Sequence, residues 1–204
     1  VGVQTHQPSV GAIVPWVRDG IGAIATQSFA NIAFGPQALA LLETGMEAPR
    51  ALAAIIAGDT MPGRRQVAIV DAAGVAAVHT GDECIPYAGH IIGDGYSCQA
   101  NMMTNAGVPE AMAAAYEAPD GLLTERIMAA LEAAQDAGGD IRGSQSAAIV
   151  IRAAGGLSRT WDMRSDNSRE PLRELRTLVN AKIAGQILAE IHPDTPVDEA
   201  MAKT

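Results

Sequence analysis

The sequence has few cysteines, few positive charges and no long hydrophobic run, and each of these absences argues against a class of protein. Two cysteines in 204 residues are too few for a disulfide framework, so a reducing compartment, the cytoplasm, is expected. The net charge of -9 argues against nucleic acid as a partner, because phosphate backbones are bound by clustered basic side chains. No apolar run approaches the roughly 20 residues that span a bilayer, so no membrane partner is expected.

The length and the continuity of the sequence predict one domain. A chain of 204 residues fits a single hydrophobic core, and no internal repeat or low-complexity linker divides it. Pro193 and Pro196 mark a loose tail over residues 190–204. We therefore predict a single domain over residues 1–204 that ends in this tail.

Periodic apolar residues predict both strands and helices. Period-two alternation indicates strands at residues 1–4 and 21–26, a β-hairpin over Gln66–Thr80 and a further strand over residues 146–152. Apolar stripes at helical spacing indicate helices that begin near Pro36, Pro49, Pro109, Leu122 and Pro171. A loop containing Trp161 precedes the last helix. This order of elements suits a layered α+β fold better than strict β-α-β alternation.

Polar and potentially reactive side chains are concentrated between His79 and Asn101. This stretch holds two of the four histidines, both cysteines and several Gly-Asp turns, whereas its flanks are mostly alanine and branched apolar residues. Such composition is typical of functional loops carried on a rigid scaffold. We therefore expect loops here, delivered by the preceding hairpin.

A zinc site is the sharpest alternative for this stretch, and the spacing argues against it. His79, Cys84, His90 and Cys98 are ligands of the zinc type, but their intervals of five, six and eight residues do not match paired zinc motifs. Buried, inert cysteines are the simpler interpretation. The Gly-Asp-Gly at residues 93–95 is too short for a dinucleotide fingerprint and reads as a turn. We expect no metal and no cofactor.

Five blocks of the sequence, in the same order, resemble the DUF1028 family of uncharacterised bacterial and archaeal proteins. The blocks are GAIVPWVRDGIGAIATQ, NIAFGPQALALLETG, VDAAGVAAVHTG, CIPYAGHIIGDGYSCQANMM and GGDIRGSQSAAIVIR. That family is grouped with the N-terminal nucleophile (Ntn) hydrolases. The resemblance therefore implies a four-layer α-β-β-α sandwich and an amidohydrolase acting on a small amide or peptide-like bond. The alternative is a non-catalytic binding or structural relative with the same fold.

In Ntn hydrolases an N-terminal Thr, Ser or Cys attacks a carbonyl while its own α-amine accepts the proton, and nearby donors stabilise the oxyanion. The family pattern implies a further strand before Val1 that carries this nucleophile, so we expect the chain as given to be catalytically incomplete, with an exposed strand edge along Val1–Gln4. The implied helper residues are Gln4, His6, Thr26, Gln27, Asp140, Arg142 and Gln145, and Asn101 adds a side-chain amide.

Each helper residue also has an ordinary structural interpretation. Gln4 could be a solvent-facing strand residue, His6 a loop histidine and His79 a satisfied strand residue. Asp140 and Arg142 could pair only with each other, and Asn101 could cap a turn. His192 reads as a solvated residue of the tail. A homodimer formed through the long terminal helix is a further expectation, since most oligomers are symmetric dimers.

Overall fold

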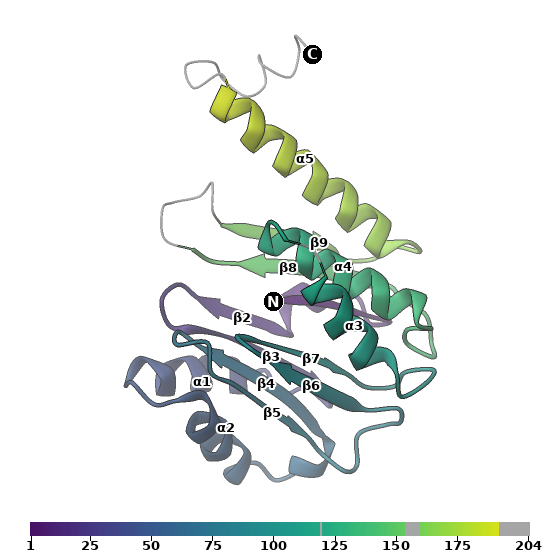
Figure 1. Cartoon of the computed structure of the whole chain (residues 1–204). Helices are drawn as coiled ribbons and strands as arrows, with labels where there is room; N and C mark the ends of the chain where they lie inside the picture. Colours follow the sequence, from purple (N-terminus) through teal and green to yellow (C-terminus); the bar gives the residue numbers. More distant parts are fainter. Residues whose placement is uncertain (119, 154–159, 192–204) are drawn as a thin grey trace.

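A computed structural model of the chain describes residues 1–118, 120–153 and 160–191, and side chains up to residue 186. Helices and strands alternate irregularly along it (Figure 1). The strands are β1 (Gly2–Thr5), β2 (Pro15–Arg18), β3 (Gly22–Ser28), β4 (Arg65–Asp71), β5 (Ala76–Thr80), β6 (Gly89–Gly93), β7 (Tyr96–Ala100), β8 (Ser146–Ile151) and β9 (Trp161–Ser165). The α-helices are α1 (Phe34–Glu43), α2 (Ala48–Ala57), α3 (Val108–Glu117), α4 (Leu123–Asp136) and α5 (Pro171–Ile191), with 3₁₀ turns η1 (Val10–Ala12) and η2 (Pro62–Arg64).

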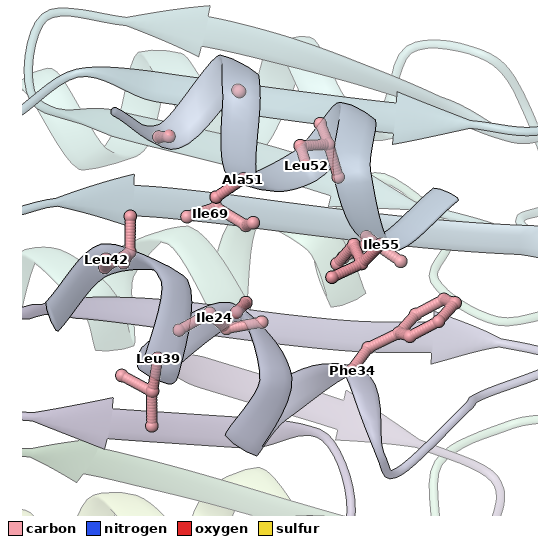
Figure 2. Close-up of a cluster of buried hydrophobic side chains, with 12 residues drawn as sticks. Ile24, Phe34, Leu39, Leu42, Ala51, Leu52, Ile55 and Ile69 are labelled. Atoms are coloured by element: carbon pink, nitrogen blue, oxygen red, sulfur yellow. The ribbon is translucent and has the colours of Figure 1, made fainter. Parts of the chain in front are cut away.

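One half of the molecule is a four-stranded antiparallel sheet in the order β2-β3-β4-β5, covered on its outer face by α1 and α2. Ile24 and Ile69 lie opposite each other in the β3–β4 register, and both are fully buried. They meet a layer of helix side chains that includes Leu39, Leu52 and Ile55 (Figure 2). Burying such a side chain contributes roughly 1.5–3 kcal/mol, so this apolar layer fixes the two helices on the sheet. We call this half the closed half.

The other half contains two separate groups of strands under α3, α4 and α5. One is the antiparallel sheet β1-β8-β9, covered by α4 and α5 through a core that includes Met128, Ile149 and Leu175. The second is the hairpin β6–β7, which packs on α3 around Tyr96 and Ala113. Because no strand joins the two groups among the described residues, we call this the split half.

The two halves meet through small apolar side chains. Val3 of β1, Ala148 of β8, and Ala25 and Ala68 of the four-stranded sheet form one buried cluster. Figure 1 shows α3, α4 and α5 on one side of the strands and α1 and α2 on the other. Successive side chains of a strand point to opposite faces of the sheet. In β3 and β4, the side chains on the same face as Ala25 and Ala68 therefore point toward the split half, and those on the same face as Ile24 point toward α1 and α2.

The structure confirms the predicted mixture of helices and sheets. Arg65–Asp71 and Ala76–Thr80 form the predicted antiparallel hairpin. The five predicted helices are present, with starts within about two residues of the expected positions. Leu172, Leu175, Val179 and Ile183 of α5 pack on the β1-β8-β9 sheet as predicted, whereas the side chain of Ile187 and the residues from His192 onward lie outside the described residues.

Two predictions about loops were wrong. Trp161 begins strand β9 and is buried against β8, because its ring fills the core under α5. The central stretch is also not a loop throughout: β6 and β7 form a hairpin around Asp94 and Gly95. Gly95, the second residue of the turn, has a φ of 75°, which glycine adopts without strain. The turn predicted for the Gly-Asp-Gly at residues 93–95 is present, at Asp94 and Gly95.

None of the helices in the described ranges is long and apolar enough to cross a bilayer.

Candidate functional site

A cavity of about 420 Å³ lies between the two halves, beside β1 and β7. We call it the first cavity. Its walls come from β1 and β7 of the split half, from the end of β3, from α3 and α4, and from the loop after α4. Five of the predicted site residues line it, namely Gln4, Gln27, Asn101, Asp140 and Arg142. Residues far apart in the sequence therefore converge on one cavity.

Three carboxamides, Gln27, Gln66 and Asn101, form a hydrogen-bonded group at the wall, which we call the carboxamide cluster. The Nε2 of Gln66 donates to the backbone oxygens of Gly89 (3.1 Å) and Ala100 (2.9 Å). Because carbonyl oxygens only accept, these bonds fix the orientation of the Gln66 amide, so its Oε1 faces Gln27 and Asn101. This oxygen accepts from Nε2 of Gln27 (2.7 Å) and from Nδ2 of Asn101 (3.1 Å).

The cluster leaves polar groups available to a ligand. Gln27 and Asn101 each use one N–H on Gln66, and within the described part of the chain their side-chain oxygens have no hydrogen-bond partner. Each carboxamide therefore presents a donor and an acceptor from the wall of the cavity. This pair of groups is complementary to an amide, which also carries one donor and one acceptor.

Within the described residues, two further polar atoms at the cavity wall are buried without a hydrogen-bond partner. They are Oε1 of Gln4 and Oγ of Ser144. The Nε2 of Gln4 donates to the backbone oxygen of Leu131 (3.0 Å), so its Oε1 is the free acceptor. A buried polar atom without a partner costs about 1–3 kcal/mol, and a bound ligand would remove that cost.

Asp140 and Arg142 form a compact ion pair at the cavity wall. The guanidinium contacts both carboxylate oxygens at 2.9 and 2.6 Å, and the Arg142 backbone N–H donates to Asp140 at 2.9 Å. Burial alone would raise the pKa of Asp140, but the hydrogen bonds from Arg142 and the nearby charge of His6 together lower it below its usual value. Asp140 therefore stays ionised and orients Arg142 at the cavity wall.

The backbone at the cavity is strained. Ser28 and Met102 line the first cavity with φ values of 64° and 59°, a left-handed conformation that costs non-glycine residues about 1–3 kcal/mol. Ser9, between the cavity residues Pro8 and Val10, has a φ of 56°. Such residues cluster at active sites and ligand clamps, where the surrounding structure holds them in place.

Three predicted site residues do not reach the cavity wall. Thr26 is fully buried on the face of β3 that points toward α1, and its hydroxyl donates to the backbone oxygen of Asn31 (3.2 Å). Gln145 donates through its side chain to Asn167 (2.8 Å). His6 lies in the loop after β1, near enough to Asp140 to affect its pKa. Because successive side chains of a strand point to opposite faces, Thr26 points toward α1 while its neighbour Gln27 points to the cavity.

Comparison with known proteins identifies the family. The sequence matches, over residues 1–175, the model of a family of unknown function, DUF1028. The chain belongs to the DUF1028 family. A crystal structure of a DUF1028 protein from Silicibacter pomeroyi is similar, with 27% sequence identity and a TM-score of 0.83 over 88% of this chain and 78% of that one. Among curated proteins, the comparison finds no match to this sequence.

Three of the four alternative zinc ligands of this DUF1028 protein have other partners. The Cys84 thiol donates to the backbone oxygen of Arg65 (3.3 Å), and His79 Nε2 lies 2.8 Å from the oxygen of Pro62. His90 Nδ1 contacts the Thr80 hydroxyl at 2.9 Å. Within the described ranges no group of three or more His, Cys, Asp or Glu side chains is placed to hold a metal.

Cys98 is buried in the split half and lines the first cavity. Burial, reinforced by the charge of Glu117, raises the pKa of the Cys98 thiol to about 12. The thiolate is the nucleophilic form of cysteine, so this residue is not activated for attack at neutral pH.

Sequence reasoning missed Gln66, the residue at the centre of the carboxamide cluster. The sequence pattern predicts it only as the first residue of a hairpin strand. A signal existed, because glutamine is out of place in the otherwise apolar run QVAIV, and a strand with both faces buried favours continuous apolar residues. A fully buried polar side chain requires hydrogen-bond partners, and here those partners form the site.

Proposed function

We propose that this DUF1028 protein binds a small amide or peptide-like substrate in the first cavity and is an amidohydrolase of the Ntn type, with the corresponding four-layer sandwich fold. The observation that carries the proposal is the carboxamide cluster. Gln66 holds Gln27 and Asn101 at fixed positions, and each presents a donor and an acceptor to the cavity. Donors held in advance are what an enzyme needs where negative charge develops on a carbonyl oxygen.

In the proposed reaction, the N–H groups of Gln27 and Asn101 hold the substrate carbonyl and stabilise the oxyanion that forms on it. Arg142, oriented by Asp140, supplies a positive charge at the cavity wall for a polar or anionic substrate group. The free acceptor of Gln4 would receive a substrate N–H. In the Ntn mechanism the nucleophile and its base belong to one residue, the first of the mature protein, so these residues need only bind and polarise the amide.

A second candidate is a non-catalytic module that binds the same ligands. It is favoured by the environments of Ser97, Cys98 and Ser144 on the cavity wall. Ser97 donates to Gln99 (3.1 Å), Cys98 has a raised pKa, and the Ser144 hydroxyl has no partner. Within the described residues none of them has a histidine or carboxylate within hydrogen-bonding distance, so none resembles an activated nucleophile.

The test measures binding and turnover separately. Small primary amides and N-acetylated dipeptide amides are titrated by calorimetry, and hydrolysis is followed by release of ammonia or amine. We expect Gln27→Leu and Asn101→Leu each to weaken binding about tenfold, the effect of one lost hydrogen bond. Gln145→Leu is the matched control, since its carboxamide lies off the cavity wall, and it should bind like the wild type.

The outcomes separate the two candidates. Turnover is measured on the mature full-length protein, because the Ntn mechanism uses the first residue of that form. Binding with turnover by it supports the hydrolase, and binding without turnover by it supports the module. Absence of binding by every amide, or wild-type affinity in both cavity variants, would reject the amide site itself.

A further inference from the structure

The first cavity meets solvent beside a group of apolar side chains, which we call the apolar rim and which consists of Ile85, Tyr87, Met102 and Met103. Ile85, Met102 and Met103 line the cavity. Tyr87 exchanges two backbone hydrogen bonds with Met103, of 3.3 and 3.2 Å. Because Ile85 lines the cavity and is also 50% exposed, it marks the place where the cavity opens.

Backbone hydrogen bonds hold the apolar rim in place. The Met102 N–H donates to the oxygen of Ile85 at 3.0 Å. Met103 pairs with Tyr87 on one side and forms an antiparallel bridge with Asp140 on the other. Side chains directly opposite each other in antiparallel segments lie on the same face. The side chains of Tyr87, Met103 and Asp140 therefore share one face, and Asp140 lines the cavity.

Met102 joins the apolar rim to the carboxamide cluster. In an extended strand, successive side chains point to opposite faces. The left-handed φ of 59° at Met102 interrupts this alternation, and the three consecutive residues Asn101, Met102 and Met103 all line the first cavity. The side-chain amide of Asn101, which bonds to Gln66, and two apolar side chains therefore face the same space.

The composition of the apolar rim indicates what it binds. Exposed apolar residues are ordinary when they occur singly, but Ile85 and Tyr87, 50% and 52% exposed, adjoin two half-buried methionines at a cavity. Ligand sites combine mostly apolar walls with a few placed polar groups. The apolar rim and the carboxamide cluster together have this composition. Methionine side chains are flexible, so such a wall adapts to apolar groups of different shape.

We propose that the substrate amide carries an apolar alkyl or aryl group, which lies on the apolar rim while the amide contacts Gln27 and Asn101. This inference rests on the proposed function, since it names the substrate class of the same site. It uses the rim residues and the carboxamide cluster, so it is independent of which residue is the nucleophile.

A second cavity is the other apolar space near the carboxamide cluster. It has a volume of about 210 Å³, adjoins the first cavity along β1 and β7, and is walled by apolar residues such as Ala25, Ala68 and Ile127. The apolar rim does not line it. Substitutions in the rim therefore distinguish between the two places for the apolar group.

The test is calorimetric titration of the full chain with acetamide, hexanamide and N-butylacetamide. The last two add the same alkyl length on the acyl side or on the amine side, so they show which side of the amide faces the rim. We expect at least one of them to bind about tenfold more tightly than acetamide. Each methylene removed from water contributes about fourfold in affinity, and the rim covers the chain on one side only.

Two isoleucines provide a matched pair of variants. Ile85→Ser should lower the affinity ratio of the preferred alkyl amide to acetamide about fivefold, because the rim loses apolar area. Ile92→Ser is the control, since Ile92 lies on β6 outside the cavity wall and is 49% exposed, and it should leave the ratio unchanged. Tyr87→Ser provides a second variant of the rim.

The outcomes separate this inference from the proposed function. Equal affinity for all three amides would overturn the inference, whereas weaker acetamide binding by Gln27→Leu would still support the proposed function. A high ratio that neither Ile85→Ser nor Tyr87→Ser lowers would also overturn the inference, because the apolar group would then lie off the rim. A ratio that falls in Ile85→Ser, with amide affinity unchanged in Gln27→Leu and Asn101→Leu, would keep the apolar rim and reject the proposed function.

Discussion

The closed half and the split half bury the apolar side chains of their helices and strands in different ways. In the closed half, four strands pair without interruption, and two helices bury their stripes on one continuous apolar layer. In the split half, five strands form two groups, and three helices pack over smaller clusters. Both cavities, the strained residues Ser28 and Met102 and both unpartnered buried polar atoms border the split half.

This difference indicates how the molecule divides its tasks. A completed apolar layer has no space for a ligand, but it is a rigid base from which Gln27 and Gln66 project toward the other half. The split half contributes Gln4, Asn101 and Asp140 from strands and loops that are not packed into a single sheet. Binding sites are often placed in this way, with adaptable segments on a rigid scaffold.

The largest effect on stability should come from the closed half. Replacing Ile69, which is fully buried at the centre of its core, by alanine should lower the free energy of unfolding by about 3–4 kcal/mol, because a cavity remains. Urea denaturation followed by circular dichroism measures the change. Ile92→Ala, at a half-exposed residue of β6, should cost less than about 1 kcal/mol. Similar losses for the two variants would break the comparison between the halves.

Gln66→Leu tests the connection between the halves. Leucine fills a similar volume but leaves the oxygens of Gly89 and Ala100 without their side-chain donor, so we expect a loss of about 3 kcal/mol. Amide binding should also disappear, because Gln27 and Asn101 lose their common acceptor. Denaturation and calorimetry provide the two readouts. A variant with lower stability but unchanged amide affinity would show that the cluster is structural only.

Asp59→Asn tests an ion pair at the end of the closed half. Asp59 contacts Arg65 at 2.6 and 3.0 Å, and both side chains are buried. Arg65 also donates to the backbone oxygen of Phe29 and lies over the rings of Phe29 and Phe34. Asparagine keeps the shape but not the charge, so we expect a loss of about 2 kcal/mol at pH 7, below the cost of deleting the side chain.

The same pair predicts a pH dependence. The hydrogen bonds from Arg65 lower the pKa of Asp59 from its usual value of about 4, so the ionised carboxylate stabilises the folded state above that pH. This stabilisation is lost as the pH falls through the folded-state pKa. The stability difference between wild type and Asp59→Asn should therefore shrink from pH 5 to pH 3. Asp82→Asn, at an exposed carboxylate, is the control, and a constant difference across this range would contradict the prediction.

Asp140→Asn should have the smallest effect on stability and a clear effect on the site. Arg142 is partly exposed, so we expect a loss below about 1 kcal/mol. Amide binding should weaken about tenfold, because Arg142 is no longer held in place. Since the pKa of Asp140 is lowered, wild-type affinity should stay constant above pH 5 and fall below about pH 4. Calorimetry across this range is the test, and an unchanged affinity would remove the ion pair from the site.

Local sequence predicted the elements well, because their signals are local. Proline near the first turn marks the starts of α2, α3 and α5, and apolar residues at helical spacing give their buried faces. The hairpin of β4 and β5 follows from alternation around a turn that contains Gly74, whose φ is 83°. The missed strand β9 lacks such a signal, because WDMRS alternates only weakly and gains its stability from pairing with β8.

The site was only partly predictable, since its groups are brought together by contacts distant in sequence. The sequence by itself determined the polar residue types and the strands that carry them. Only the tertiary structure decided that Gln27 points to the cavity while Thr26 points to the core, and that Gln66, 39 residues from Gln27 and 35 from Asn101, joins both amides. The physical reason is that a buried amide must satisfy its donors and acceptors, and which partners it finds depends on how the sheets pack.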